Sequence, residues 1–93
     1  MIRSFKNSVS EKVFEGENPR RFAGLDFDLA RARLDYLDSV GDLGDIPAMK
    51  SFSLHGLKGS RKGQWAISVN GPWRICFKWR DGEALEVEIV DYH

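Results

Sequence analysis

The sequence is poor in residues that join a small protein through covalent bonds or metal ions. Its 93 residues include one cysteine, Cys76, and two histidines, His55 and His93. One cysteine cannot form an internal disulfide, and no cluster of His and Cys has the spacing of metal ligands. We therefore expect a fold held by packing alone, with no metal and no other cofactor.

Long hydrophobic runs are also missing. No segment approaches the roughly 18 apolar residues that cross a bilayer, and residues 1–6 lack the apolar stretch of a secretory signal. We expect a soluble cytoplasmic protein with no membrane partner. The composition is 42% hydrophobic and 12% aromatic, which supplies one compact core but not two. Residues 1–93 are thus predicted to form a single domain.

The net charge of the whole chain is zero, but the charges are unevenly distributed along it. The chain has 14 basic and 14 acidic residues, yet the segment 50–80 contains no Asp or Glu and seven basic residues: Lys50, Lys58, Arg61, Lys62, Arg74, Lys78 and Arg80. That segment carries +7 and the remainder −7. Such a polarised molecule offers one part to phosphate and another to a cationic partner, although a solvated surface can also segregate charge by chance.

Helical patterns occupy the first half of the chain. Residues 8–11 have the Ser-x-x-Glu form of a capping box, which predicts a short helix that Gly16 ends. Apolar residues then recur with helical spacing over 25–40, where Asp26 or Asp28 can cap the start. The segment thus predicts the main amphipathic helix.

Strand patterns dominate the second half. Apolar and polar residues alternate over 65–69, 73–79 and 85–89, and a short opening strand is expected over 2–5. A second hairpin turn is expected over 80–82. The alternation over 85–89 predicts that Leu85 faces the core.

The turn between the first two long strands decides their register. A two-residue turn at Asn70 and Gly71 would mix core and charged residues on one face, so we favour a three-residue loop that includes Pro72. That loop pairs three apolar couples, Trp65 with Phe77, Ile67 with Ile75 and Val69 with Trp73. It leaves Ser68, Arg74, Cys76 and Lys78 on the opposite face.

These elements predict an α+β fold, in which two N-terminal helices pack on one face of a small, twisted, mainly antiparallel sheet. The helices should cover the Trp/Ile/Phe face. The other face, with Arg74 and Lys78, should remain open. Trp65, Trp73 and Trp79 are interpreted as core residues and Cys76 as a small packing residue.

An open basic face with two histidines suits the cleavage of an RNA strand. This reaction needs a group that takes a proton from a 2′-hydroxyl, cations that hold the phosphate charge and a group that protonates the leaving oxygen. His55 and His93 are the acid–base candidates. A surface loop position for His55, and a frayed terminus for His93, are the structural alternatives.

Cations flank these histidines in the sequence. Lys58, Arg61 and Lys62 lie between glycines in a loop that can approach a sugar–phosphate chain, and Lys78 shares the strand of Arg74. The planar guanidinium of Arg74 can hold two phosphate oxygens, or can instead form a cross-strand pair with Glu88.

The C-terminal residues add further candidates. Tyr92 can stack on a base, and Asp91 can orient a histidine or accept a hydrogen bond from a base. Strict alternation puts Tyr92 on the face of Arg74 but Asp91 and His93 on the other face. The three residues therefore meet Arg74 only if the strand bends or ends there.

Four segments together resemble a known family: Met-Ile-Arg-Ser-Phe at 1–5, Leu-His-Gly-Leu-Lys-Gly at 54–59, Trp-Arg-Ile at 73–75 and Val-Asp-Tyr-His at 90–93. The chain resembles the HigB (host inhibition of growth) toxins, a branch of the RelE/ParE superfamily. The resemblance implies a RelE-like, microbial-ribonuclease-like fold and metal-free cleavage of mRNA in the ribosomal 30S A site, which inhibits translation. It also implies a HigA-like helix-turn-helix antitoxin, through which the complex binds operator DNA.

By position, the resemblance implies an active-site set of His55, Lys58, Arg74, Asp91, Tyr92 and His93, with Arg61, Lys62 and Lys78 as RNA contacts. Gly56 and Asn70 depart from the family pattern, in which Pro and Arg are often found. Two other functions stay open at this point. One is a ParE-like toxin that poisons a protein such as DNA gyrase without cutting RNA, and the other is an RNA-binding module without catalysis.

Overall fold

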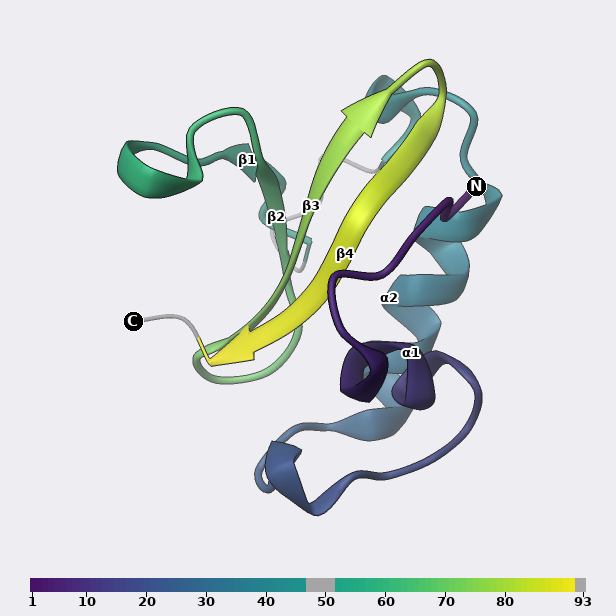
Figure 1. Cartoon of the computed structure of the whole chain (residues 1–93), viewed down its shortest axis with the longest axis vertical. Helices are drawn as coiled ribbons and strands as arrows, with labels where there is room; N and C mark the ends of the chain where they lie inside the picture. Colours follow the sequence, from purple (N-terminus) through teal and green to yellow (C-terminus); the bar gives the residue numbers. More distant parts are fainter. Residues whose placement is uncertain (47–51, 92–93) are drawn as a thin grey trace.

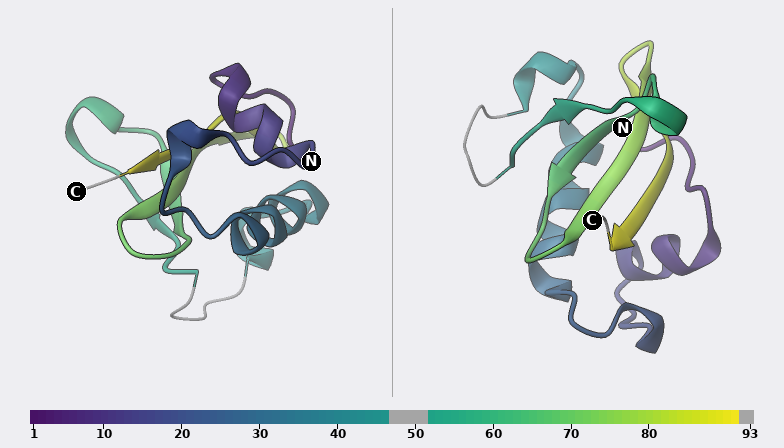
Figure 2. Two further views of the ribbon diagram at one scale, coloured as in Figure 1. Left: turned by 90° about the horizontal axis from the view of Figure 1, so that it is seen from below. Right: turned by 90° about the vertical axis from the view of Figure 1, so that its left-hand side faces the viewer.

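The structure, a computed structural model, describes residues 1–46 and 52–91. Two helices, α1 (Ser8–Phe14) and α2 (Phe27–Ser39), lie on one side of a four-stranded antiparallel sheet (Figures 1 and 2). The strands are β1 (His55–Gly56), β2 (Trp65–Ser68), β3 (Trp73–Arg80) and β4 (Glu83–Asp91), adjacent in the order β1-β2-β3-β4. The predicted α+β class is confirmed. No helix in the described ranges is long and apolar enough to span a membrane.

The N-cap of helix α1 lies one residue before the predicted one. The side chain of Asn7, rather than Ser8, accepts a hydrogen bond from the Ser10 backbone N–H at 3.0 Å. The capping box therefore located the helix but not its capping residue, because the amide oxygen of Asn7 performs the same function. Gly16 follows the helix with φ +105°, the left-handed conformation that was predicted to end it.

Helix α2 supplies the apolar stripe that packs on the sheet. Asp26 caps it by accepting a hydrogen bond from the Leu29 N–H at 3.1 Å. Ala30, Leu34 and Leu37 lie on its buried side, spaced three and four residues apart. Complete burial of a leucine contributes about 1.5–3 kcal/mol to stability. This stripe fixes which side of the helix faces the strands.

The register of the first hairpin confirms the three-residue loop. Trp65 pairs with Phe77, and Ile67 pairs with Ile75, as predicted. The loop 70–72 thus keeps apolar residues on one face and polar residues on the other. The second hairpin turns through two residues at 81–82, both with positive φ, as a type I′ turn requires.

A bulge in β4 changes which residues face the core. Glu86 and Val87 both oppose Phe77, and Glu86 adopts φ +51°. The extra residue reverses the alternation before it, so Ala84 is buried and Leu85 lies on the opposite face. The prediction that Leu85 enters the core was wrong because alternation cannot reveal a bulge.

The N-terminal segment does not form the predicted strand. It runs parallel to β4 and makes only two isolated bridges, at Ile2 and Phe5. The bulge lies between the two bridges and interrupts the ladder, while the Ser4 hydroxyl accepts a hydrogen bond from the Glu86 N–H at 2.9 Å. The segment therefore covers the outer edge of β4.

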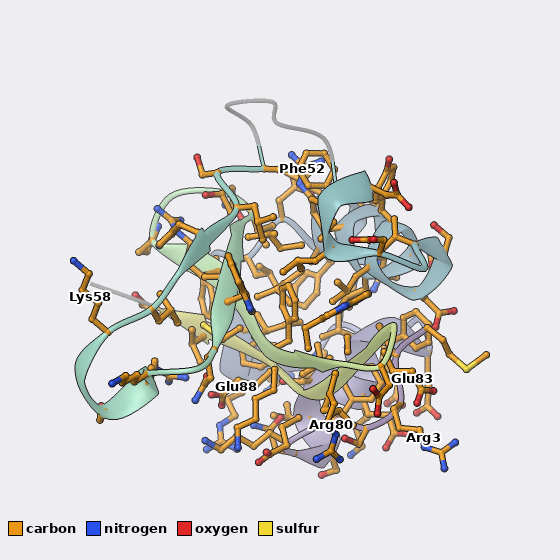
Figure 3. The ribbon with its side chains drawn as sticks, turned by 90° about the horizontal axis from the view of Figure 1, so that it is seen from above. Arg3, Phe52, Lys58, Arg80, Glu83 and Glu88 are labelled. Carbon is orange, nitrogen blue, oxygen red and sulfur yellow. The ribbon has the colours of Figure 1, made fainter. Side chains whose placement is uncertain are left out.

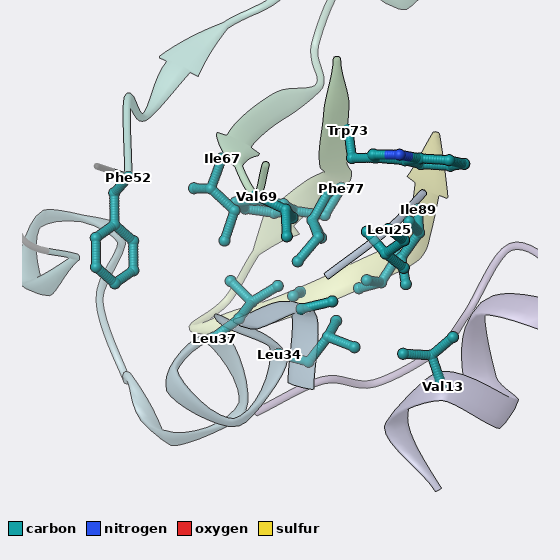
Figure 4. Packing of buried hydrophobic residues seen from close by; sticks show 14 of the residues in the cluster. Val13, Leu25, Leu34, Leu37, Phe52, Ile67, Val69, Trp73, Phe77 and Ile89 are labelled. Atoms are coloured by element: carbon teal, nitrogen blue, oxygen red, sulfur yellow. The ribbon is translucent and has the colours of Figure 1, made fainter. Parts of the chain in front are cut away.

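The core lies between the sheet and the helices (Figure 4). Ile67, Ile75 and Phe77 are fully buried there, and Trp73 is nearly so. A second, smaller apolar cluster lies on the other face and contains Leu57, Ala66 and Cys76, with Val90 packed against it. The expectation of a wholly open second face was therefore wrong, since the loop after β1 places Leu57 over its centre.

Candidate functional site

The sheet face opposite the helices, called here the second face, carries most of the candidate residues. The register places two rows on it: His55, Ala66, Cys76 and Glu88 in one, and Ser68, Arg74 and Val90 in the next. Strand spacing puts the Cα atoms of His55 and Arg74 roughly 12 Å apart. Two long side chains can bridge that distance to one nucleotide.

His55 is exposed on β1, and its ring is oriented by the backbone. Its Nδ1 lies 2.7 Å from the carbonyl oxygen of Ser53. A carbonyl oxygen can only accept, so this contact requires the proton on Nδ1. Ser53 has φ +45°, an uncommon value for a residue with a side chain. In the neutral ring, Nε2 is then left as the acceptor.

The segment 57–63, called here the basic loop, lies over the second face. Leu57 is 8% exposed, and its N–H donates to the Gln64 carbonyl at 2.9 Å. Lys58 and Lys62 are exposed, and in the described parts of the chain neither side chain forms an ion pair. Lys58 points away from the helices (Figure 3). Both ammonium groups are thus placed to meet an anion.

Two of the other predicted RNA contacts already have carboxylate partners. Arg61 Nη1 lies 2.7 Å from Glu88 Oε1, and Lys78 Nζ lies 2.7 Å from Glu86 Oε2. The hydrogen bond from Lys78 holds the pKa of the Glu86 carboxyl below its usual value. RNA contact by Arg61 and Lys78 stays a prediction, and it would require these ion pairs to be exchanged.

Arg74 is half-buried and is held by backbone carbonyls instead of Glu88. Its Nη1 donates to the Gly71 and Trp73 carbonyl oxygens, both at 2.8 Å. Among the described residues, Nε and Nη2 have no acceptor. That edge of the guanidinium can hold two phosphate oxygens.

The C-terminal candidates are described only in part. Asp91 ends β4 and pairs with Trp73, so it belongs to the other side of the sheet from Arg74, as alternation predicted. Tyr92 and His93 lie outside the described residues. Their convergence with Arg74 therefore stays a prediction.

Cys76 has the packing role that the sequence indicated. Its side chain is 0% exposed, and burial raises the pKa of the thiol. The charges of Arg61, Arg74 and Lys6 act in the opposite direction and lower this pKa, whereas Glu88 raises it further. A buried thiol of raised pKa is a poor nucleophile.

The sequence predicted Glu88 only as a possible partner of Arg74, and it did not single out Lys6. A glutamate that alternates with apolar residues in a strand is typical of a solvated face, so its burial was not expected. One signal for Glu88 was available in the sequence. Glu88 lies on the strand that neighbours the basic strand of Arg74 and Lys78, where it pairs with Cys76.

Comparison with known proteins identifies the fold and the family. Residues 3–93 match the HigB-like toxins, described as the RelE-like toxin of the type II toxin–antitoxin system HigB. The chain belongs to this family. A HigB-like toxin of a type II system acts with an antitoxin partner.

Two relatives of known name extend over nearly the whole HigB-like chain. Endoribonuclease HigB of Proteus vulgaris is 34% identical over 93 residues, which is 100% of both chains. Toxin HigB-1 of Vibrio cholerae is 30% identical over 86 residues, 91% of this chain and 90% of the relative. A crystal structure of a YafQ mutant from Escherichia coli has a TM-score of 0.64 at 17% identity, covering 96% of this chain and 91% of that one. The likeness to YafQ concerns the fold.

Proposed function

We propose that this toxin is an endoribonuclease that cuts mRNA in the ribosomal A site and so inhibits translation. The observation that carries the proposal is the second face, where His55 presents Nε2 on the same side of the sheet as Lys58 and Arg74, two cations that have no carboxylate partner among the described residues. The family and the relative named an endoribonuclease support the same activity. They do not favour the ParE-like alternative, in which a protein target is poisoned.

The proposed chemistry needs only acid, base and cations. The 2′-oxygen attacks the neighbouring phosphorus and loses its proton to a base, while the P–O5′ bond breaks and an acid protonates the 5′-oxygen. The products are a 2′,3′-cyclic phosphate and a 5′-hydroxyl. His55 and His93 share the acid–base work, and either histidine can take either role. Asp91 joins them if the end of β4 turns toward the second face, because its register position lies on the other side of the sheet from Arg74.

The remaining candidates hold the substrate. Lys58 and Arg74 stabilise the charge that builds on the phosphate, because cations at fixed positions favour the transition state over the ground state. Tyr92 positions a base by stacking, and Lys62 extends the phosphate contact. Lys78 contributes as an RNA contact when its ion pair with Glu86 opens.

Membership of the family supports the partners proposed for this toxin. The antitoxin is a HigA-like helix-turn-helix protein that takes the complex to operator DNA, and the toxin acts on ribosomes in the cytoplasm as a single domain of residues 1–93. Its acidic helical half suits a cationic antitoxin surface.

Primer extension on translated mRNA after induction tests the proposal. His93→Gln and Arg74→Ala should each reduce cleavage by about a hundredfold or more, since each removes acid–base or charge stabilisation. Lys12→Ala, an exposed change on α1, is the matched control and should cleave normally. Unchanged cleavage in both site variants would contradict the assignment. Gyrase inhibition with intact mRNA would favour the ParE-like function instead.

A further inference from the structure

Glu88 places an acidic side chain on the second face, where the proposed reaction requires cations and no such carboxylate. It lies on the second face, in the same row as His55, and is only 7% exposed. A buried carboxylate on an RNA-binding surface repels phosphate and carries a desolvation cost unless it is paired. Its contacts therefore indicate what it does.

Glu88 joins three segments that are distant in sequence. Its Oε1 lies 2.7 Å from Arg61 Nη1 in the basic loop and 3.6 Å from Lys6 Nζ in the N-terminal segment. Arg61 Nη1 also donates to the Gln64 side chain at 3.1 Å. A charge-assisted hydrogen bond to a nearly buried carboxylate is far stronger than an exposed ion pair.

The basic loop has few other means of holding its position. It contains a single 3₁₀ turn, Gly59–Arg61, and Gly59 and Gly63 both have positive φ. Glycine increases the entropy that ordering such a loop must overcome. Leu57 anchors the start of the loop in the small apolar cluster, and Arg61 anchors its far side on Glu88. Lys58 lies between the two anchors.

We propose that Glu88 is a positioning residue, which acts through Arg61 to hold the basic loop over the second face and to present Lys58 to the phosphate. The inference rests on the proposed function, because it gives Lys58 its role in RNA cleavage. It also gives Arg61 a structural role in place of a direct RNA contact.

The two possible roles of Glu88 predict effects of opposite sign. If Glu88 acted only through its charge, Glu88→Gln would remove a repulsion and RNA would bind more tightly. If Glu88 positions the loop, the same change frees Arg61, the loop samples other positions and cleavage slows. Substitution by glutamine keeps the shape of the side chain and removes its charge. Slower cleavage therefore indicates the positioning role, and tighter RNA binding without slower cleavage indicates an effect of charge alone.

The test is a double-mutant cycle measured as the single-turnover cleavage rate on mRNA-programmed ribosomes. Glu88→Gln and Arg61→Met should each slow cleavage about tenfold, because each weakens or removes one hydrogen bond to a charged group, whose contribution corresponds to a factor of that size. The double variant should be no slower than either one, because both remove the same contact. Arg61→Lys should recover part of the rate. Lys62→Met, which has no such contact, should combine independently with Glu88→Gln.

A second measurement reports the loop itself. Hydrogen exchange at the Leu57 amide, which is bonded to Gln64, should speed up about tenfold in both Glu88→Gln and Arg61→Met relative to wild type. Arg61 lies in a surface loop, so Arg61→Met tests the idea even if Glu88→Gln does not fold.

The outcomes are distinct. Faster or unchanged cleavage in Glu88→Gln, or independent effects of Glu88→Gln and Arg61→Met, would overturn the positioning role. Wild-type protein that does not cleave mRNA would overturn the proposed function alone, since the exchange measurement would still report whether Glu88 orders the loop.

Discussion

At the scale of single residues, the partner of each side chain decides its role more than its type does. Arg61 and Arg74 are both arginines in the basic segment, yet one is bonded to a carboxylate and the other to two backbone carbonyls. Arg74 keeps an open edge of its guanidinium among the described residues. The sequence placed Arg74 in the active-site set and Arg61 among the RNA contacts, but it could not identify the partner of either side chain.

The orientation of His55 gives a prediction that needs no activity. Because Nδ1 lies against the Ser53 carbonyl, the neutral ring should carry its proton on Nδ1 and keep Nε2 as the acceptor. Long-range ¹H–¹⁵N correlation spectra of the neutral ring should show this tautomer. Protonation on Nε2 would show that the Ser53 contact is not made in solution. His55→Gln is the control that identifies the signal.

At the scale of elements, local chemistry sets where the helices start, and neighbouring strands set where the sheet bends. Asp26 and Gly16 act as their residue types predict. The bulge at Glu86 and the shortened N-terminal pairing depend on contacts between segments some 80 residues apart, such as the hydrogen bond of Ser4. Periodicity within one segment contains no information about such contacts.

The capping residue of α1 can be tested by paired alanine substitutions. Asn7→Ala should lower the free energy of unfolding by about 1 kcal/mol, because the Ser10 N–H loses its acceptor. Ser8→Ala should change it by only a few tenths of a kcal/mol, since Ser8 lies inside the helix. Urea denaturation followed by circular dichroism measures both. A larger loss in Ser8→Ala would restore the capping box as first predicted.

At the scale of the whole molecule, the fold separates the charges that the sequence already divides. Both helices lie on one side of the sheet, and the basic loop lies on the other side with Lys58 projecting outward (Figures 2 and 3). The zero net charge therefore does not prevent RNA binding, since Lys58, Lys62 and Arg74 lie on one side of the sheet without a carboxylate partner among the described residues.

Salt dependence measures this separation. Binding to a single-stranded RNA should weaken steeply as the salt concentration rises. In a plot of the logarithm of the binding constant against the logarithm of the salt concentration, each phosphate contact should add about 0.7 to the steepness of the slope. Lys62→Met should reduce the steepness by about that amount, whereas Lys12→Met on α1 should leave it unchanged. Fluorescence anisotropy at several salt concentrations gives the slopes. Equal slopes for wild type and Lys62→Met would remove Lys62 from the RNA contacts.

The sequence by itself determined the α+β class, the helix signals, the register of the first hairpin and the family, because these depend on local propensities, alternation and motifs read along the chain. It also supplied the candidate set from His55 to His93. Only the tertiary structure decided the bulge, the burial of Glu88 and the partners of Arg61, Arg74 and Lys78. These features arise from contacts between segments far apart in sequence, which no local pattern records.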